Sequence, residues 1–153
     1  MSEPTNVKYV VKNRRARHDY EIRETLEVGI ALQGSEVKSL REGKVQLSDA
    51  YAQIEKGEVI LKNLHISPYK MASENHDPIR PRRLLLHRKE IRKLVILTEQ
   101  RGLTLIPLSI YFRKNIAKVE LAVAMGRKKY DKRQAIAEAE ADRSIKRAMR
   151  KDY

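Results

Sequence analysis

Apolar and polar residues alternate along a long segment near the N-terminus. From Tyr20 to Leu32 every even position is apolar except Glu24, a period of two that predicts one long β-strand with its apolar side chains on a single face. Gly29 lies within this segment and predicts a bend or a bulge. The odd-numbered Glu27 would then face away from the core.

Two further pairs of segments show the same alternation. Residues 45–54 and 58–66 predict a hairpin, because the short connection between them contains a glycine that can adopt a positive φ. Residues 104–112 and 117–125 predict a second strand pair, in which Pro107 indicates an edge or a bulged position.

Helical spacing appears at three places. Ser35 can cap a short helix that Gly43 would close in a left-handed conformation. Residues 87–102 predict a longer helix that Gly102 would stop. The stripe on one face of this helix consists of Ile91, Leu94, Val95 and Thr98. Residues 134–151 are rich in helix formers but contain few large apolar residues, so this helix would need a partner to be stable.

The segment between the hairpin and the longer helix has a different character. Residues 67–83 contain three prolines, lack an apolar period and end in basic residues, which predicts an exposed loop. The whole order, about six antiparallel strands with two or three helices, fits an oligonucleotide-binding-type Greek-key barrel. A helix-packed open sheet is the alternative. We expect residues 1–125 to form the barrel domain and residues 126–153 to form a basic C-terminal tail.

Composition limits the classes of protein to consider. The 153 residues carry a formal net charge of +13, which indicates a polyanionic partner because charge balance governs partners rather than fold. The apolar runs are far shorter than the roughly 20 residues of a membrane-spanning helix, and the N-terminus lacks a signal-peptide core. We therefore expect a cytoplasmic protein with no membrane partner. The absence of Cys excludes disulfides and thiolate zinc sites.

The positive charge is concentrated in three clusters. Residues 8–23 carry a net charge of +4, residues 78–93 carry +6, and the third cluster is the sequence GRKKYDKR at residues 126–133. A solvated surface would explain any one cluster, but three in one chain favour a phosphate backbone. RNA is favoured over DNA because the sequence shows no zinc finger, basic zipper or convincing helix-turn-helix, while barrels with Tyr and Arg surfaces commonly bind irregular RNA.

Few residues suggest catalysis. The four histidines are scattered over different predicted elements without metal-ligand spacing, and the isolated glycines form no phosphate-binding loop. Glu36, Asp49 and Glu58 could be brought together by folding into a nuclease-like metal site, which leaves a metal-dependent RNA-processing enzyme as one alternative. Apart from this alternative, we expect no enzyme activity, no metal and no cofactor.

Four stretches of the chain occur in a distinctive order and spacing between about Lys8 and Arg133: NRRARHDYEI, LQGSEVKSLREGK, LLLHRKEI and GRKKYDKR. They resemble the SsrA-binding protein family, also called small protein B. The resemblance implies an oligonucleotide-binding-type barrel that holds the tRNA-like domain of transfer-messenger RNA and carries it into ribosomes stalled on messages lacking a stop codon. The alanyl-charged RNA then supplies a tag-encoding frame, and the incomplete product is marked for proteolysis.

The same resemblance implies the partners. They are transfer-messenger RNA, the ribosome at its small-subunit decoding region and mRNA channel, and elongation factor Tu, which is reached indirectly through the charged RNA. The protein would be a noncatalytic adaptor, and we expect a monomer.

Carried onto this sequence, the contacts of the family with the tRNA-like domain fall on Asn13, Arg14, Arg17, His18, Glu27, Leu85 and His87. The side chains of Asn13 and His18 have donors for base edges, and the arginines neutralise phosphate. Leu85 could pack on an unstacked base. Two alternatives remain: Leu85 could belong to the core, and Glu27 could be an ordinary solvated carboxylate.

The resemblance also implies a role for the tail. It would be disordered when free and helical on the ribosome, where it would enter the empty message channel. The residues that would contact the ribosome are Gly126, Arg127, Lys128, Lys129, Tyr130, Asp131, Lys132, Arg133, Arg143, Lys146 and Arg147. A solvated charged tail is the alternative for this segment, and a general RNA-binding barrel whose tail has no role is the alternative for the whole chain.

Overall fold

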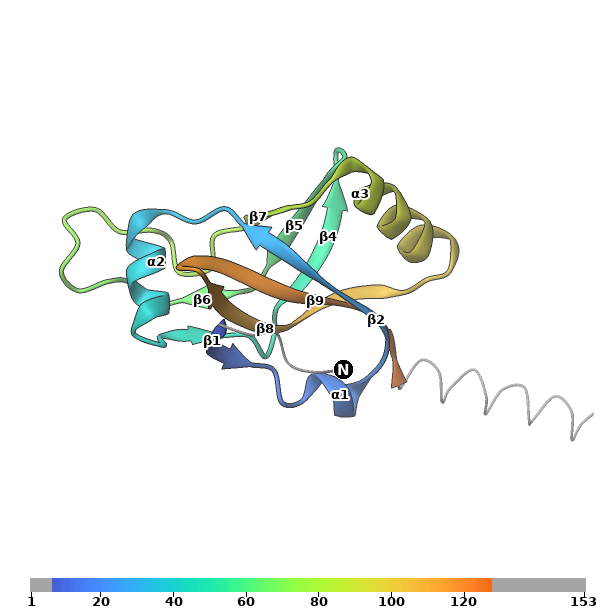
Figure 1. Cartoon of the computed structure of the whole chain (residues 1–153), viewed down its shortest axis with the longest axis horizontal. Helices are drawn as coiled ribbons and strands as arrows, with labels where there is room; N and C mark the ends of the chain where they lie inside the picture. Colours follow the sequence, from blue (N-terminus) through green and yellow to red (C-terminus); the bar gives the residue numbers. More distant parts are fainter. Residues whose placement is uncertain (1–6, 128–153) are drawn as a thin grey trace, which may run out of the picture.

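Residues 7–127 are the part of the chain that the computed structural model describes (Figure 1). In chain order, the strands are β1 (Val7–Lys12), β2 (Tyr20–Ile30), β3 (Val45–Gln46), β4 (Tyr51–Glu55), β5 (Glu58–Lys62), β6 (His65–Ile66), β7 (Arg82–Leu85), β8 (Thr104–Arg113) and β9 (Ile116–Gly126). The helical segments are α1 (Ala16–Asp19), α2 (Gly34–Arg41), α3 (Arg88–Val95) and η1 (Ile96–Gln100), a π-helical turn that continues α3.

Strand pairing closes a barrel. The order β8-β4-β5-β7-β2-β9 forms a ring, because β9 also pairs with β8. All these pairings are antiparallel, and β1 adds to the ring by pairing with β8. β3 and β6 form a separate two-stranded sheet. The predicted mainly β barrel is therefore confirmed, and the open sheet is excluded.

The core lies inside this ring. Val59, Leu61, Ile110 and Val119 are completely buried, as expected when alternate residues of closed strands fill a small barrel. Figure 1 shows α2 at one end of the barrel and α3 at the other. Both helices contribute a leucine to the core, Leu40 from α2 and Leu94 from α3.

Two bulges divide the apolar alternation between two clusters. The register shifts between Ile22 and Glu24 in β2 and between Pro107 and Ser109 in β8. A bulge moves the following residues to the other face of the strand. As a consequence, the even-numbered apolar residues at the start of each strand leave the main core and form a second cluster around Ala16 of α1, namely Ile22, Ile106 and Leu108.

These bulges correct two predictions from the pattern. The single apolar face predicted for residues 20–32 is wrong at its beginning, and Gly29 is not the bulged residue. Gly29 instead allows a close approach, since a Cβ there would lie 3.2 Å from the Cβ of Leu85. Pro107 does mark a bulge, but β8 pairs on both sides and is not an edge strand.

The predicted hairpin is correct at its centre and wrong at its ends. β4 and β5 pair around a turn in which Lys56 and Gly57 both have positive φ. Residues 47–50 form a turn instead of extending the first strand, with the backbone N–H of Ala50 donating to the carbonyl of Leu47 (2.9 Å). The second strand is interrupted by Asn63, whose φ is 59°.

The two helices predicted within residues 7–127 are found with small shifts, and the helix predicted for residues 134–151 lies outside the described residues. Gln33 rather than Ser35 precedes α2, and Gly43 closes it with a φ of 72°. Residues 88–100 are helical, and Gly102 follows them in the left-handed conformation. Three elements were not predicted: β1, α1 and β7. Their basic residues hide the short apolar alternation, and the first half of β7 fell within the predicted exposed loop of residues 67–83.

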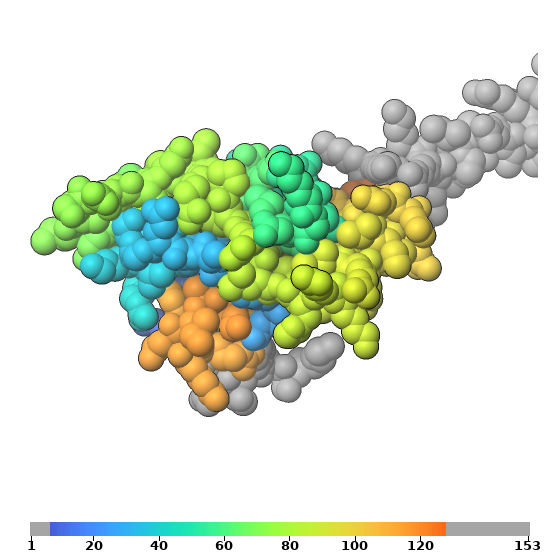
Figure 2. All heavy atoms as spheres, turned by 90° about the horizontal axis from the view of Figure 1, so that it is seen from above, coloured from blue at the N-terminus to red at the C-terminus, as the bar shows by residue number. Residues whose placement is uncertain are grey.

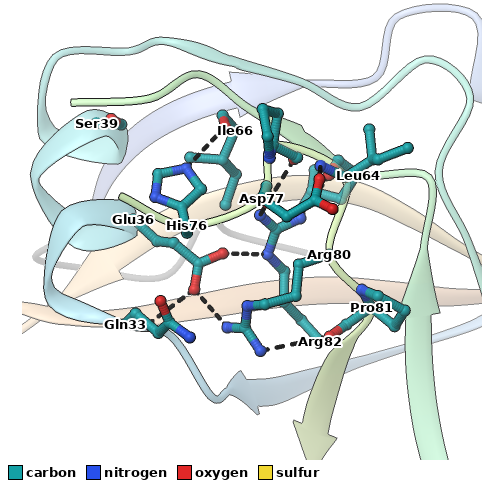
Figure 3. A network of polar contacts seen from close by, with 12 residues as sticks. Gln33, Glu36, Ser39, Leu64, Ile66, His76, Asp77, Arg80, Pro81 and Arg82 are labelled. Atoms are coloured by element: carbon teal, nitrogen blue, oxygen red, sulfur yellow. Dashed lines mark hydrogen bonds and ion pairs between the residues drawn. The ribbon is translucent and has the colours of Figure 1, made fainter. Parts of the chain in front are cut away.

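A buried ionic network anchors the loop of residues 67–81 to α2 (Figure 3). The carboxylate of Glu36 accepts hydrogen bonds from the guanidinium groups of Arg80 and Arg82 and from the backbone N–H of Gln33 (2.8 Å). Arg82 also donates to the carbonyl of Leu64 (2.5 Å). The network explains how a loop without an apolar period keeps its position beside α2 at one end of the molecule (Figure 2).

Arg82 therefore contradicts its predicted place in an exposed basic segment. Its side chain is completely buried, as is that of Glu36. Burial alone would raise the pKa of Glu36, but the hydrogen bonds from Arg80, Gln33 and Arg82 outweigh it and hold that pKa below its ordinary value.

Candidate nucleic-acid interface

A groove of about 980 Å³ runs over the outside of the barrel, lined by β1, the turn and short helix α1 that follow it, β2, β8 and Glu120 of β9. Four of the seven residues predicted to bind the tRNA-like domain line this groove: Asn13, Arg14, Arg17 and Glu27. Its further cationic side chains are those of Lys12 and Arg23. The structure thus brings the N-terminal basic cluster and the outer face of β2 into one site.

Asn13 holds the turn that carries the arginines. Its backbone N–H donates to the carbonyl of Leu108 (2.7 Å), and its side-chain amide donates to the carbonyl of Pro107 (3.3 Å). These two carbonyls lie at the bulge of β8, where the regular strand pairing is interrupted. Asn13 therefore links the groove to the barrel, in addition to offering polar atoms at its surface.

The side chains of Arg14 in this turn and of Arg17 and His18 just after it are exposed. Arg14 and Arg17 line the groove, while His18 lies on the short helix α1 outside its lining. The carbonyl of Arg17 accepts a hydrogen bond from the guanidinium of Arg127 (3.4 Å). This contact places the beginning of the predicted tail segment beside the turn.

Glu27 lies on the outer face of β2, as the alternation predicts, and it is not simply solvated. Its carboxylate accepts hydrogen bonds from the hydroxyl of Tyr111 (2.5 Å) and from Nη2 of Arg113 (2.8 Å). Partial burial would raise the pKa of Glu27, but the bonds from Arg113 and Tyr111 hold it below its ordinary value. Burial and the neighbouring carboxylate raise the pKa of Tyr111, so its hydroxyl remains a donor.

Aromatic rings continue the groove from Glu27 toward β1. The rings of Tyr9 and Tyr111 are 5.5 Å apart at a tilt of 59°, and Nζ of Lys12 lies 4.2 Å from the centre of the Tyr9 ring. Sequence reasoning did not single out either tyrosine. The strand alternation does predict that Tyr111 points outward, because Ile110 and Phe112 on either side of it point into the core.

Leu85 and His87 lie outside the lining of this groove. Leu85 is 48% exposed, so its assignment to the core is wrong. It pairs with Gly29 across β2 and β7, two residues along β2 from Glu27. His87 precedes α3, and its backbone N–H donates to the carboxylate of Glu90 (3.1 Å). Leu85 thus extends the outer face that carries Glu27 toward the basic side chains at the start of α3.

The described residues do not form the nuclease-like metal site. Glu36 is buried in its ionic network, and Glu58 forms an ion pair with Arg83 (3.5 Å). Within residues 7–127 no three His, Asp or Glu side chains gather in a way that could hold a metal ion. The same part of the chain contains no helix of the length and apolarity needed to cross a membrane.

Only the first two of the predicted ribosome-contacting residues belong to the described part of the chain. Gly126 ends β9, and Arg127 follows it. The predictions for Lys128, Lys129, Tyr130, Asp131, Lys132, Arg133, Arg143, Lys146 and Arg147 lie outside the described residues.

A closed oligonucleotide-binding-type barrel with a groove lined by exposed arginines and by tyrosines defines a nucleic-acid-binding barrel protein. Comparison with known proteins gives the family. The model of the SmpB protein family matches residues 10–151, and the chain belongs to this family.

Relatives and a solved structure agree with this family. The chain is 58% identical to the SsrA-binding protein of Halothermothrix orenii over 146 residues, which cover 95% of this chain and 94% of the relative. It is 55% identical to the SsrA-binding protein of Geobacillus thermodenitrificans over 144 residues, 94% of this chain and 93% of the relative. A chain in the solved structure described as "tmRNA-SmpB: a journey to the center of the bacterial ribosome" has a TM-score of 0.64 and 55% identity, covering 80% of this chain and 85% of that chain.

Proposed function

We propose that this protein is the RNA-binding adaptor of trans-translation. It binds the tRNA-like domain of transfer-messenger RNA, delivers this RNA to stalled ribosomes, and thereby allows the nascent peptide to be tagged for degradation and the ribosome to be released. The observation that carries the proposal is the match of almost the whole chain to SsrA-binding proteins, together with a groove of the right chemistry on the barrel. The protein is an adaptor and not an enzyme, and its place of action is the cytoplasm.

The protein makes two kinds of contact with the RNA, one with phosphates and one with bases and other polar groups. Arg14 and Arg17 neutralise phosphates along the groove, since guanidinium groups pair with phosphate oxygens in a fixed geometry. Asn13, His18 and His87 supply polar contacts, Glu27 accepts donors of the RNA, and Leu85 packs on an unstacked base. The exposure of Leu85 supports this role, because an apolar side chain at the surface is available to a base.

The tail acts later, on the ribosome. Arg127 and the cluster that follows it in the sequence contact ribosomal RNA, and the remaining residues enter the empty mRNA channel. Elongation factor Tu participates only through the charged RNA, and the protein acts as a monomer. The contact of Arg127 with the carbonyl of Arg17 supports a hinge that begins directly beside the RNA groove.

A tagging assay with stalled ribosomes tests this division. Deletion of residues 134–153 should leave the affinity for transfer-messenger RNA within about twofold and abolish tagging, because the barrel and its groove are complete without them. A general RNA-binding barrel would lose little function on the same deletion. If the wild-type protein fails to support tagging at all, the adaptor function is wrong.

A further inference from the structure

The groove is not uniformly basic, and its acidic residues are arranged in a particular way. Glu27 on β2 and Glu120 on β9 occupy directly opposite positions in the strand pair, and both line the groove. Two neighbouring carboxylates repel each other and repel phosphate. A site that only neutralised a phosphate backbone would gain nothing from them. Carboxylates at this place suit a hydrogen-bond donor better than a phosphate.

The hydrogen bonds of Glu27 leave part of its carboxylate free. Oε2 accepts from the hydroxyl of Tyr111 (2.5 Å) and from Nη2 and Nε of Arg113 (2.8 and 3.1 Å). Oε1 accepts only from Nε of Arg113, at 3.2 Å. Because an ionised carboxylate has about four acceptor positions, Oε1 retains capacity for a further donor. About a third of the side chain is exposed (34%), so a ligand in the groove can reach it.

The partners of Glu27 are themselves held in place. Tyr111 is only 2% exposed, and its ring packs against Tyr9 at a centroid distance of 5.5 Å. The guanidinium carbon of Arg113 lies 5.9 Å from the centre of the Tyr111 ring. A glutamate at a surface normally samples several rotamers, and ordering it on binding costs free energy. Here the hydrogen bonds from Tyr111 and Arg113 orient the carboxylate in the RNA-free protein.

We infer that Tyr111 and Arg113 are positioning residues that orient the Glu27 carboxylate as an acceptor for a neutral donor of the RNA, either a base N–H or a ribose hydroxyl. The inference rests on the proposed function and deepens it. The arginines at the groove bind the phosphates that all RNAs share, whereas the oriented carboxylate selects RNAs that present a donor at the correct place. Glu27 then contributes to selectivity more than to affinity for RNA in general.

Binding titrations with the full-length protein test this inference. The ligands are a transcript of the tRNA-like domain of transfer-messenger RNA and an unrelated hairpin RNA. Tyr111→Phe removes only the hydroxyl, and it should weaken binding of the tRNA-like transcript by about tenfold, the effect of one hydrogen bond to a charged group. Its affinity for the hairpin should stay within about twofold. Tyr51→Phe removes a hydroxyl from β4, away from the groove, and should change neither affinity.

A double substitution distinguishes positioning from an independent contact. Glu27→Gln should weaken binding of the tRNA-like transcript at least as much as Tyr111→Phe, and the combined variant should bind like Glu27→Gln alone, because the hydroxyl acts through the carboxylate. Additive losses, or equal losses toward both RNAs, would overturn the inference. If Tyr111→Phe lowers the melting temperature strongly, Arg113→Gln at the surface provides the same test. Unchanged selectivity of the Arg113→Gln variant would also contradict the inference.

The two sources of the donor are separated by transcripts of the tRNA-like domain in which 2′-deoxynucleotides replace one segment at a time. If the penalty of Glu27→Gln persists on every one of these transcripts, the donor is a base N–H; if it disappears on one of them, the donor is a ribose hydroxyl. The wild-type protein supplies the remaining control. A wild type without preference for the tRNA-like transcript contradicts the proposed function itself, whereas a preference that survives Tyr111→Phe and Arg113→Gln contradicts only the positioning role.

Discussion

At the scale of single residues, ionisable side chains determine both the position of the loop and the chemistry of the groove. Glu36 and Arg82 are completely buried and bonded to each other, and the bonds of Arg82 to backbone carbonyls extend this pair into the loop of residues 67–81. A buried charge that loses its partner is strongly unfavourable. The pair therefore makes the loop and α2 depend on each other.

Replacing Glu36 should destabilise the whole domain. We expect Glu36→Gln to lower the free energy of unfolding by about 3 kcal/mol, because Arg82 would remain buried with a neutral partner. Glu58→Gln is the matched control, since the Arg83–Glu58 pair is half exposed and such pairs contribute less than about 1 kcal/mol. Urea denaturation followed by circular dichroism measures both. If both substitutions lower the free energy of unfolding by the same small amount, the buried network does not stabilise the domain as proposed.

The pH dependence of stability should report the same carboxylate. The pKa of Glu36 is lowered in the folded protein, so its contribution is present above the ordinary pKa of a glutamate, about 4.3, and is lost as the pH falls through the lower folded value. Wild-type stability should thus fall more steeply below about pH 5 than that of Glu36→Gln. Denaturation curves at several acidic pH values compare the slopes, and parallel slopes would show that another group is responsible.

Residue roles could be predicted from the sequence only in part. The outward direction of Glu27 follows from the period of two, since a strand with one buried face fixes where odd residues point. The burial of Arg82 does not follow, because its neighbours in the chain are basic and its partner Glu36 is far away in the sequence. The bond between Glu27 and Tyr111 is similarly a product of strand register, which pattern alone does not give.

At the scale of elements, bulges and a close strand contact shape the face that bears the groove. The bulge in β8 exposes the carbonyls that Asn13 binds, and the pairing of Gly29 with Leu85 lets β2 and β7 approach closely. The bulge occurs at a proline and the close strand contact occurs at a glycine, two residue types that can be recognised in the sequence. The location of a bulge within a strand was predictable for Pro107, whereas the bulge after Ile22 has no proline or glycine to indicate it.

Gly29→Ala should change RNA binding through Leu85. The added Cβ would lie 3.2 Å from Cβ and 3.3 Å from Cδ1 of Leu85, so the leucine must shift. We expect a severalfold loss of affinity for the tRNA-like transcript, and a loss of stability of about 1 kcal/mol from the crowded contact. Binding titrations and thermal unfolding measure the two effects.

Gly34→Ala provides the control for this substitution. No atom lies within 4 Å of a Cβ at position 34, and the residue is in the first turn of α2. Alanine there should leave RNA affinity unchanged and raise stability by up to about 1 kcal/mol, because it restricts the unfolded chain. If both variants bind RNA like the wild type, Leu85 has no role in the interface.

At the scale of the whole molecule, the closed barrel gathers basic and acidic groups in one groove on its outer surface. Sequence patterns predicted the barrel well, because closed antiparallel strands bury one face and leave a strong alternation. Charge clustering predicted an RNA partner but not the groove, whose walls come from β1, β2, β8 and β9. The groove depends on which strands become neighbours when the ring closes, and no local pattern contains that information.

The salt dependence of binding should fall when the arginines of the groove are neutralised. Removing one phosphate contact lowers the slope of log K against log salt by about 0.7 to 0.9. We therefore expect Arg14→Gln and Arg17→Gln each to reduce the slope by about that amount for any RNA. Lys56→Gln in the β4–β5 turn, outside the groove lining, should leave it unchanged. Unaltered slopes in both arginine variants would remove the groove as the phosphate-binding site.

The central claim is that the barrel selects transfer-messenger RNA and that the tail acts only on the ribosome. Its most direct test is a titration of the full-length protein and of a version ending at Tyr130 against transfer-messenger RNA and an ordinary tRNA, at low and at physiological salt. We predict that both versions prefer transfer-messenger RNA and keep this preference in physiological salt. A preference that disappears with salt or with the tail would contradict the claim and reduce the charge clusters to nonspecific attraction.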